Sequence, residues 1–286
     1  MKRISKQIIL FLTFFTNALC FAQLDVVYDK LVWSDEFDSN KIAPINPDLW
    51  FQQTQLPTGT NWHNGEIQHY TNKIENAFVQ NGNLNIVAIK EEFYDQGHTK
   101  SYTSARLNSK FAFTYGRIDV RAKIPLEAGT WPAIWLLGKN VNEKGGYWQP
   151  KFGTTGWPAC GEIDIMEHGI FPNMPLNFVQ SAIHTPSSKG NTINKGGTLV
   201  SNLETDFHVY SLNWSPNQLT FLLDNEIYYI YKPSVKDEKT WPFDSDQYIL
   251  LNVAIGGNAG EIDPSFTKTG MLVDYVRVYQ SADEKD

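Results

Sequence analysis

Three acidic residues lie within six positions of one another in the segment Gly161–Glu167, whose sequence is Gly-Glu-Ile-Asp-Ile-Met-Glu. Side chains alternate between the two faces of a β-strand, so Glu162 and Asp164 share one face while the isoleucines point into the core. Glu167 has the wrong parity to join them unless the strand absorbs one extra residue. A β-bulge near residues 165–166 would absorb it, and bulges are common beside active sites.

Carboxyl groups gathered in this way are the machinery of glycoside hydrolysis, in which a retaining enzyme holds them about 5–5.5 Å apart and an inverting one about 6.5–9.5 Å. The two glutamate backbones are expected about 13 Å apart along the strand, and side chains leaning together permit retention. We expect Glu162 to be the nucleophile and Glu167 the acid/base. Asp164 then holds Glu162 in place and keeps Glu167 partly protonated by like-charge repulsion. His184, in the next segment Ser181–His184, hydrogen-bonds Asp164 if that strand lies alongside.

A solvated strand face is the ordinary alternative for three acids in a row. The chain offers its own comparison in Glu261-Ile262-Asp263, which repeats the first half of the pattern without a third acid. Pro264 follows directly and cannot donate to a strand ladder, so we expect a loop there. The Glu-x-Asp pattern alone is therefore weak evidence for an active site. The interpretation of residues 162–167 as catalytic depends on the third acid, Glu167.

The elements that position these residues are predicted to be strands. Arg117–Lys123 alternates polar and apolar residues, and Leu84–Ile89 is an apolar run of strand length. Leu219–Leu223, the turn Asp224-Asn225 and Glu226–Tyr231 form a predicted hairpin. Two further strands are expected at Tyr248–Ile255 and Met271–Tyr279. No window predicts a long capped helix, so the pattern indicates an all-β sandwich or jelly roll.

Length and composition favour one large folded unit. The 286 residues are 42% hydrophobic, 19% charged and 14% aromatic, with nine Trp, which is enough apolar mass for a full core and for a sugar-stacking cleft. No flexible linker divides the chain, and Lys139–Gly156 is expected to be a loop over the site. We therefore expect one catalytic domain at residues 23–286.

The first 22 residues have the pattern of a signal peptide, with three basic residues, an apolar run and a cleavage site after Ala22. The run is too short to span a bilayer. Bulky Leu19 disfavours lipid anchoring at Cys20, so we expect a secreted or periplasmic protein. Removal of residues 1–22 changes the formal charge from −7 to −10. So acidic a protein is not expected to bind nucleic acid or anionic lipid. Cys160 then has no partner for an intrachain disulfide, and we expect it to be a small buried residue.

Seven segments in order resemble the laminarinase branch of glycoside hydrolase family 16. They are the acid motif and Leu31–Phe37, Asn64–Thr71, Ser104–Arg106, Trp131–Gly138, Leu251–Asn258 and Val273–Tyr279. The resemblance spans nearly the whole mature chain. It implies a β-jelly-roll sandwich of two curved antiparallel sheets with an open substrate cleft, a monomer, and no cofactor for catalysis.

The resemblance also implies roles for individual residues. It supports Glu162, Asp164 and Glu167 as catalytic and makes Met166 the bulged residue. The implied substrate contacts are Asn64, Arg106, Trp131, Trp135 and Asn258, together with His184 and the loop residues Trp148 and Trp157. Core packing is the alternative for the tryptophans, and an ordinary salt bridge for the arginine. A structural calcium ion is implied near the joined termini, at Glu36, Gly82 and Asp274; oxygen ligands suit it.

The leading hypothesis is a retaining endo-β-1,3-glucanase that acts on β-1,3-glucan or mixed-linkage β-1,3/1,4-glucan, with the polysaccharide as its partner. An agarase-like galactan hydrolase on the same scaffold is a second possibility. A β-glucan-binding recognition protein is the third, and it is disfavoured because the catalytic acids are present.

Overall fold

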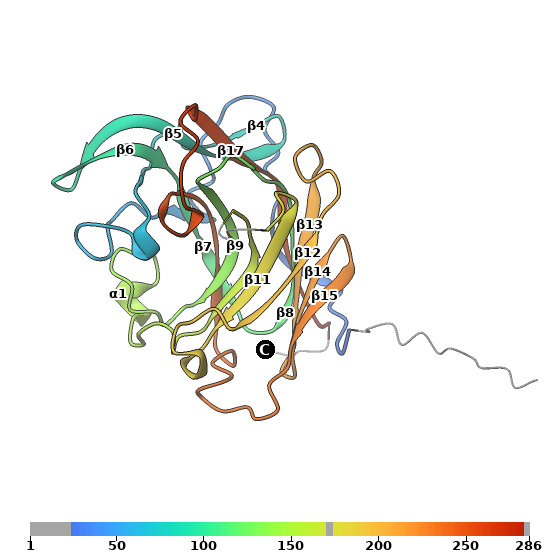
Figure 1. Ribbon diagram of the computed structural model, residues 1–286. Helices are drawn as coiled ribbons and strands as arrows, with labels where there is room; N and C mark the ends of the chain where they lie inside the picture. Colours follow the sequence, from blue (N-terminus) through green and yellow to red (C-terminus); the bar gives the residue numbers. More distant parts are fainter. Residues whose placement is uncertain (1–23, 170–173, 283–286) are drawn as a thin grey trace, which may run out of the picture.

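The computed structural model describes residues 24–169 and 174–282 and folds them into two stacked β-sheets (Figure 1). All described strand pairs are antiparallel except the short pair β3–β6. The predicted all-β sandwich of two antiparallel sheets is therefore confirmed.

A ten-stranded sheet has the order β15-β14-β13-β8-β17-β5-β6-β3, with β1 beside β17 and β4 beside β5. Its strands are β1 (Lys30–Asp35), β3 (His69–Tyr70), β4 (Ala77–Gln80), β5 (Asn83–Asp95), β6 (His98–Ser104), β8 (Gly116–Lys123), β13 (His208–Trp214), β14 (Leu219–Leu223), β15 (Glu226–Tyr231) and β17 (Lys268–Gln280).

A seven-stranded sheet has the order β12-β11-β10-β9-β16-β7-β2 and carries the acid motif on β10. Its strands are β2 (Trp50–Gln52), β7 (Arg106–Phe113), β9 (Thr130–Gly138), β10 (Glu162–Glu167), β11 (Phe178–His184), β12 (Asn194–Leu199) and β16 (Gln247–Ile255). The described helices are short: α1 (Gln149–Phe152) and the 3₁₀ turns η1 (His63–Gly65), η2 (Pro186–Ser188) and η3 (Gly257–Ala259).

Local sequence patterns account for the strands. Residues of β8 alternate between buried and half-buried positions along its whole length, as the polar–apolar alternation predicts. The predicted hairpin is β14–β15, and its turn residues Asp224 and Asn225 have φ values of 50° and 70°. Two consecutive left-handed residues are the requirement of a two-residue type I′ turn, which Asp and Asn tolerate. Glu261–Asp263 lies outside the strands, as expected from Pro264.

The main core fills the space between the sheets. Its largest wholly buried side chains include Trp214, Phe221 and Phe243. The strand β16 is buried at every position, because one face packs in this core and the other lies under loops that cover the sheet. Within the ten-stranded sheet, β1 pairs with the central strand β17 from Lys30↔Gln280 to Asp35↔Val276, so both ends of the described chain belong to the same sheet.

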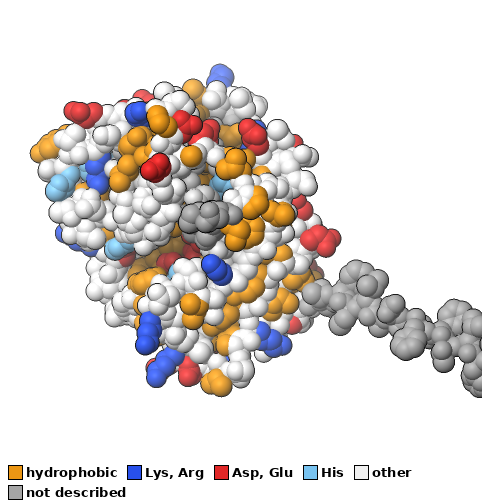
Figure 2. All heavy atoms as spheres, viewed as in Figure 1, with side chains coloured by type: hydrophobic (Ala, Val, Ile, Leu, Met, Phe, Trp, Pro, Cys, Tyr) orange, Lys and Arg blue, Asp and Glu red, His pale blue; other side chains and the backbone are white. Residues whose placement is uncertain are grey.

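On the face that Figure 2 shows, Lys and Arg side chains are dispersed and do not gather into one basic patch. Among the residues described, no helix is long and apolar enough to cross a membrane.

Candidate active site

The strand β10 contains the irregularity that the parity of its acids requires. Opposite β9, Asp164 pairs with Trp135 and Met166 pairs with Ile134, which leaves Ile165 without a partner of its own. Opposite β11 the register also shifts between Asp164 and the end of β10. The bulge predicted near residues 165–166 is present, with Ile165 rather than Met166 as the unpaired residue on the β9 side.

The bulge turns the last glutamate toward the other acids. Ile165 and Met166 are consecutive, yet both side chains are wholly buried in the core between the sheets. Alternation therefore restarts one residue late, and Glu167 emerges on the face that carries Glu162 and Asp164. All three carboxyl groups line one cleft of about 360 Å³ on this face.

The cleft lies across the seven-stranded sheet and is closed at its sides by loops. Its lining combines tryptophans with acids and amides: Pro57, His63, Asn64, Glu66, Arg106, Trp131, Ala133, Trp135, Leu137, Val141, Asn142, Glu143, Lys144, Trp157, Glu162, Asp164, Glu167 and Asn252. The structure thus brings together most of the residues predicted from sequence. The loop Lys139–Gly156 contributes Val141 to Lys144, as a loop over the site should.

Glu162 stands between a hydrogen-bond donor and a cation. The indole Nε1 of Trp157 donates to its Oε2 over 3.0 Å, and Nε2 of His184 lies 3.7 Å from its Oε1. Burial, followed by the charge of Asp164, raises the pKa of Glu162, while His184 and the Trp157 N–H oppose that rise. Burial prevails and the pKa of Glu162 rises to about 8, with these two partners limiting the rise.

His184 is held beside the acids by strand pairing, because β11 places it directly opposite Glu162. Its Nε2 lies 3.3 Å from Oδ2 of Asp164, so the two side chains form the predicted pair at ion-pair distance, without the geometry of the predicted hydrogen bond. Burial alone would lower the pKa of His184, but the close contact and charge of Asp164, with the two glutamates, raise it to about 9. His184 is therefore protonated at neutral pH.

Glu167 is the more strongly protonated of the two glutamates. The indole Nε1 of Trp131 donates to its Oε1 over 3.1 Å, and the carboxyl group is buried. Burial, then the charge of Asp164, raises the pKa of Glu167 well above its usual range. Burial thus raises the pKa of both glutamates, but that of Glu162, which has two opposing partners, rises less than that of Glu167.

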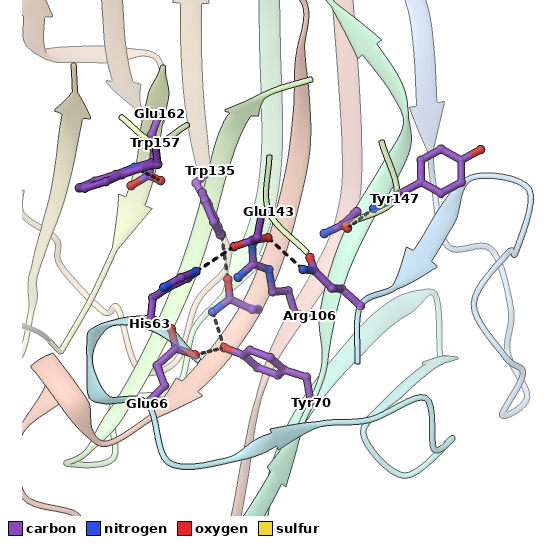
Figure 3. Close-up of polar contacts among 12 residues, drawn as sticks. His63, Glu66, Tyr70, Arg106, Trp135, Glu143, Tyr147, Trp157 and Glu162 are labelled. Carbon is purple, nitrogen blue, oxygen red and sulfur yellow. Dashed lines mark hydrogen bonds and ion pairs between the residues drawn. The ribbon is translucent and has the colours of Figure 1, made fainter. Parts of the chain in front are cut away.

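Trp135 is fixed at both its edge and its face. Its Nε1 donates to Oδ1 of Asn252 over 2.8 Å, Asn252 donates to the Tyr70 hydroxyl over 3.1 Å, and that hydroxyl donates to Glu66 over 2.9 Å (Figure 3). The guanidinium of Arg106 lies 4.9 Å from the ring centroid of Trp135. A ring held in this way is a preorganised platform for a sugar face.

Three predicted substrate contacts are absent from the cleft lining: Trp148, Asn258 and His184, the last of which lies against Glu162 and Asp164. Trp148 packs against a small apolar cluster under the loop. Because an indole away from solvent needs an acceptor, its N–H donates to the backbone carbonyl of Ser109 over 3.1 Å. Asn258 is exposed on η3, beyond the rim of the cleft. Asn252, six residues earlier in the same motif and on β16, is the asparagine that faces the cleft.

The lining residues that the sequence interpretation missed include His63, Glu66, Glu143 and Asn252. Asn252 has a signal, since it is the single polar residue in the middle of the apolar run Tyr248–Ile255. Glu66 lies inside the motif Asn64–Thr71. Glu143 lies in a loop with no periodicity and carries no signal.

Cys160 is 1% exposed and, as predicted, a small buried residue. Burial, followed by the charge of Glu162, raises the pKa of its thiol to about 12, so it is not a thiolate nucleophile.

Of the predicted calcium residues, Glu36 directly follows β1, Asp274 lies on β17, and Gly82 lies in the turn between β4 and β5; none of them lines the cleft. Glu36 accepts two hydrogen bonds from Arg277, at 3.0 and 2.7 Å, and Asp274 accepts one from Arg121 at 2.6 Å. Both carboxylates already have cationic partners, so a calcium ion here needs backbone carbonyl oxygens as ligands. The calcium site remains a prediction.

Comparisons with known proteins identify the family. A family model described as glycosyl hydrolases family 16 matches residues 64–277. A β-glucanase from Rhodothermus marinus is 37% identical over 88% of this chain and 85% of its own length. The crystal structure of a LamA variant from Z. galactanivorans, in complex with laminaritriose and laminaritetraose, is 43% identical with a TM-score of 0.81, over 89% of this chain and 100% of that one. The laminarinase from Rhodothermus marinus gives 37% identity and a TM-score of 0.73, over 88% and 97%. The chain belongs to glycoside hydrolase family 16.

Proposed function

We propose that this chain is a retaining endo-β-1,3-glucanase that hydrolyses β-1,3-glucans and mixed-linkage β-1,3/1,4-glucans. The bulge at Ile165 carries the proposal, because it brings three carboxyl groups of one strand into one cleft beside tryptophan rings. The relatives support the substrate class: one is named a β-glucanase, and a solved relative holds laminaritriose and laminaritetraose.

In the proposed reaction, Glu162 attacks the anomeric carbon while Glu167 gives its proton to the departing glycosidic oxygen. The resulting glycosyl-enzyme ester is hydrolysed by a water molecule that Glu167 deprotonates, so the configuration is retained. Asp164 and the protonated His184 lie against Glu162 and hold its carboxylate in place. The environments of the two glutamates differ in the direction that these roles need, since the Trp157 N–H and His184 limit the rise in the pKa of Glu162 while the pKa of Glu167 rises well above its usual range.

The test is reducing-end release from laminarin, lichenan and agarose in parallel, with the anomer of the first product identified by NMR. We expect release of β-anomers from laminarin, loss of turnover in Glu162→Gln, and unchanged turnover in the matched control Glu261→Gln. Release from agarose alone would make the protein a galactan hydrolase. Binding of laminarin without turnover would make it a recognition protein.

The proposed function includes export. Residues 1–22, which lie outside the described residues, are proposed to be removed after Ala22, leaving a monomer with a formal charge of −10. Mass spectrometry of the protein from culture medium, with size-exclusion chromatography, tests both points. A cell-retained chain that starts at Met1 contradicts the export proposal.

A further inference from the structure

Glu143 is an acid in the cleft wall, its side chain 10% exposed, that the proposed chemistry does not use. Its Oε2 accepts hydrogen bonds from Nη2 of Arg106 over 2.8 Å and from Nε2 of Gln53 over 2.9 Å (Figure 3). Nε2 of His63 lies 3.5 Å from its other oxygen. Burial alone would raise the pKa of Glu143, but the charge of Arg106 and these donors lower it to about 2. The side chain is therefore a fixed anion, and it touches three separate segments of the chain.

Arg106 is held on its remaining sides by rings. Its guanidinium carbon lies 5.3 Å from the ring centroid of Trp62 and 4.9 Å from that of Trp135. Its Nε has no hydrogen-bond partner, although the residue is only 4% exposed and lines the cleft. A guanidinium fixed between two rings and one carboxylate, and lining the cleft, can offer an N–H group on its cleft side to a hydroxyl group.

The loop that presents Glu143 is fastened to the strand that presents Arg106. The backbone N–H of Tyr147 donates to Oδ1 of Asn108 over 3.3 Å, and the indole of Trp148 donates to Ser109 over 3.1 Å; both acceptors are on β7. Trp148 thus anchors the loop without touching the cleft. Loop and strand are one unit, so the carboxylate and the guanidinium keep a fixed relative position.

The backbone of this unit lies away from the strand that carries the acids. Three strand spacings separate β10 from β7 in the sheet order, which is about 14 Å between backbones. The guanidinium of Arg106 leans back over the Trp135 ring on β9 but bonds to Glu143 rather than to the three acids, so it faces a sugar beside the one that is attacked. An interaction there acts on the binding of long chains rather than on the chemical step.

We propose that Glu143 is a positioning residue that holds Arg106 between Trp62 and Trp135 and so builds a distal sugar site for long β-glucan chains. The proposal rests on the proposed function, because it assigns the distal arm of the same cleft. Without Glu143 the guanidinium has Glu66 as its next acidic neighbour and leaves its place over the Trp135 face. A role in folding alone would instead weaken turnover of short and long substrates equally.

The test compares Glu143→Ala and Glu143→Gln with Lys151→Ala, an exposed change in the same loop outside the cleft lining. Each variant is assayed on laminarihexaose and on laminaritriose. We expect Glu143→Ala to raise KM for the hexaose about tenfold or more, with kcat and triose hydrolysis changed less than about twofold. Glu143→Gln keeps the shape of the side chain, so its KM for the hexaose should lie between those of the wild type and Glu143→Ala. The KM of Lys151→Ala should match that of the wild type.

Binding is measured separately in a Glu162→Gln background, where calorimetry with laminarihexaose should show a similar increase in Kd on adding Glu143→Ala. Equal losses on both oligosaccharides, or an unchanged hexaose KM with unchanged Kd, overturn the positioning role. A wild-type protein that cleaves neither oligosaccharide overturns the proposed function instead.

Discussion

Asp164 controls the proton of Glu167, and replacing it with asparagine should move the pH dependence of turnover. The charge of Asp164 is the second cause, after burial, of the raised pKa of Glu167. Asp164→Asn keeps the shape and removes the charge, so the pKa of Glu167 falls. Since Glu167 must be protonated to release the leaving group, the alkaline limb of kcat shifts to lower pH.

The size of the shift follows from the strand. With one residue absorbed by the bulge, Asp164 and Glu167 are two strand steps apart, about 6.6 Å. Two unit charges at that separation interact by about 2.5 kcal/mol at an effective dielectric constant of about 20, which is roughly 1.8 pKa units. Screening by His184 reduces this, because its cation lies 3.3 Å from Asp164. We expect a shift of about one pH unit.

The assay is kcat on saturating laminarin from about pH 4 to pH 10, because kcat reports the ionisations of the enzyme–substrate complex. Asp263→Asn is the matched control, since Asp263 occupies the same place in the loop copy of the Glu-x-Asp pattern. An alkaline limb of Asp164→Asn that stays in place or moves to higher pH refutes the reasoning, whatever the loss in absolute rate.

Three further predictions concern other parts of the molecule. Deleting Met166 leaves Glu-Ile-Asp-Ile-Glu, whose strict alternation keeps all three acids on one face without a bulge. The variant should therefore retain laminarin hydrolysis while losing roughly 2–5 kcal/mol of stability with the buried side chain, and a folded but inactive variant contradicts this. Cys160→Ala should keep activity within about twofold, and a larger loss at unchanged melting temperature would give the thiol a catalytic role. Calcium should raise the melting temperature and a chelator lower it, with the difference absent in Asp274→Asn; identical melting curves would remove the calcium prediction.

The strands and the acid site are predictable because their signals are local. The alternation in β8, the Asp224-Asn225 turn and the parity of β10 each depend on residues adjacent in sequence. The bulge is predictable for the same reason: a third acid on the wrong parity has no use unless the strand is irregular. Its position is resolved only by pairing, because the sheet register decides that Ile165 is the residue without a partner on β9.

Loop residues depend instead on contacts between distant segments. Glu143 meets Arg106 and Gln53, which lie 37 and 90 residues away, and nothing near Glu143 in sequence indicates either. Trp148 illustrates the converse, since an indole in a loop over the site is equally able to line the cleft or to anchor the loop. Which of the two occurs depends on where its N–H finds an acceptor, and here that acceptor is Ser109 on β7. The catalytic acids of the cleft are therefore predictable from the sequence of one strand. The contacts of Glu143 and Arg106 are not, because they join segments that only the folded chain brings together.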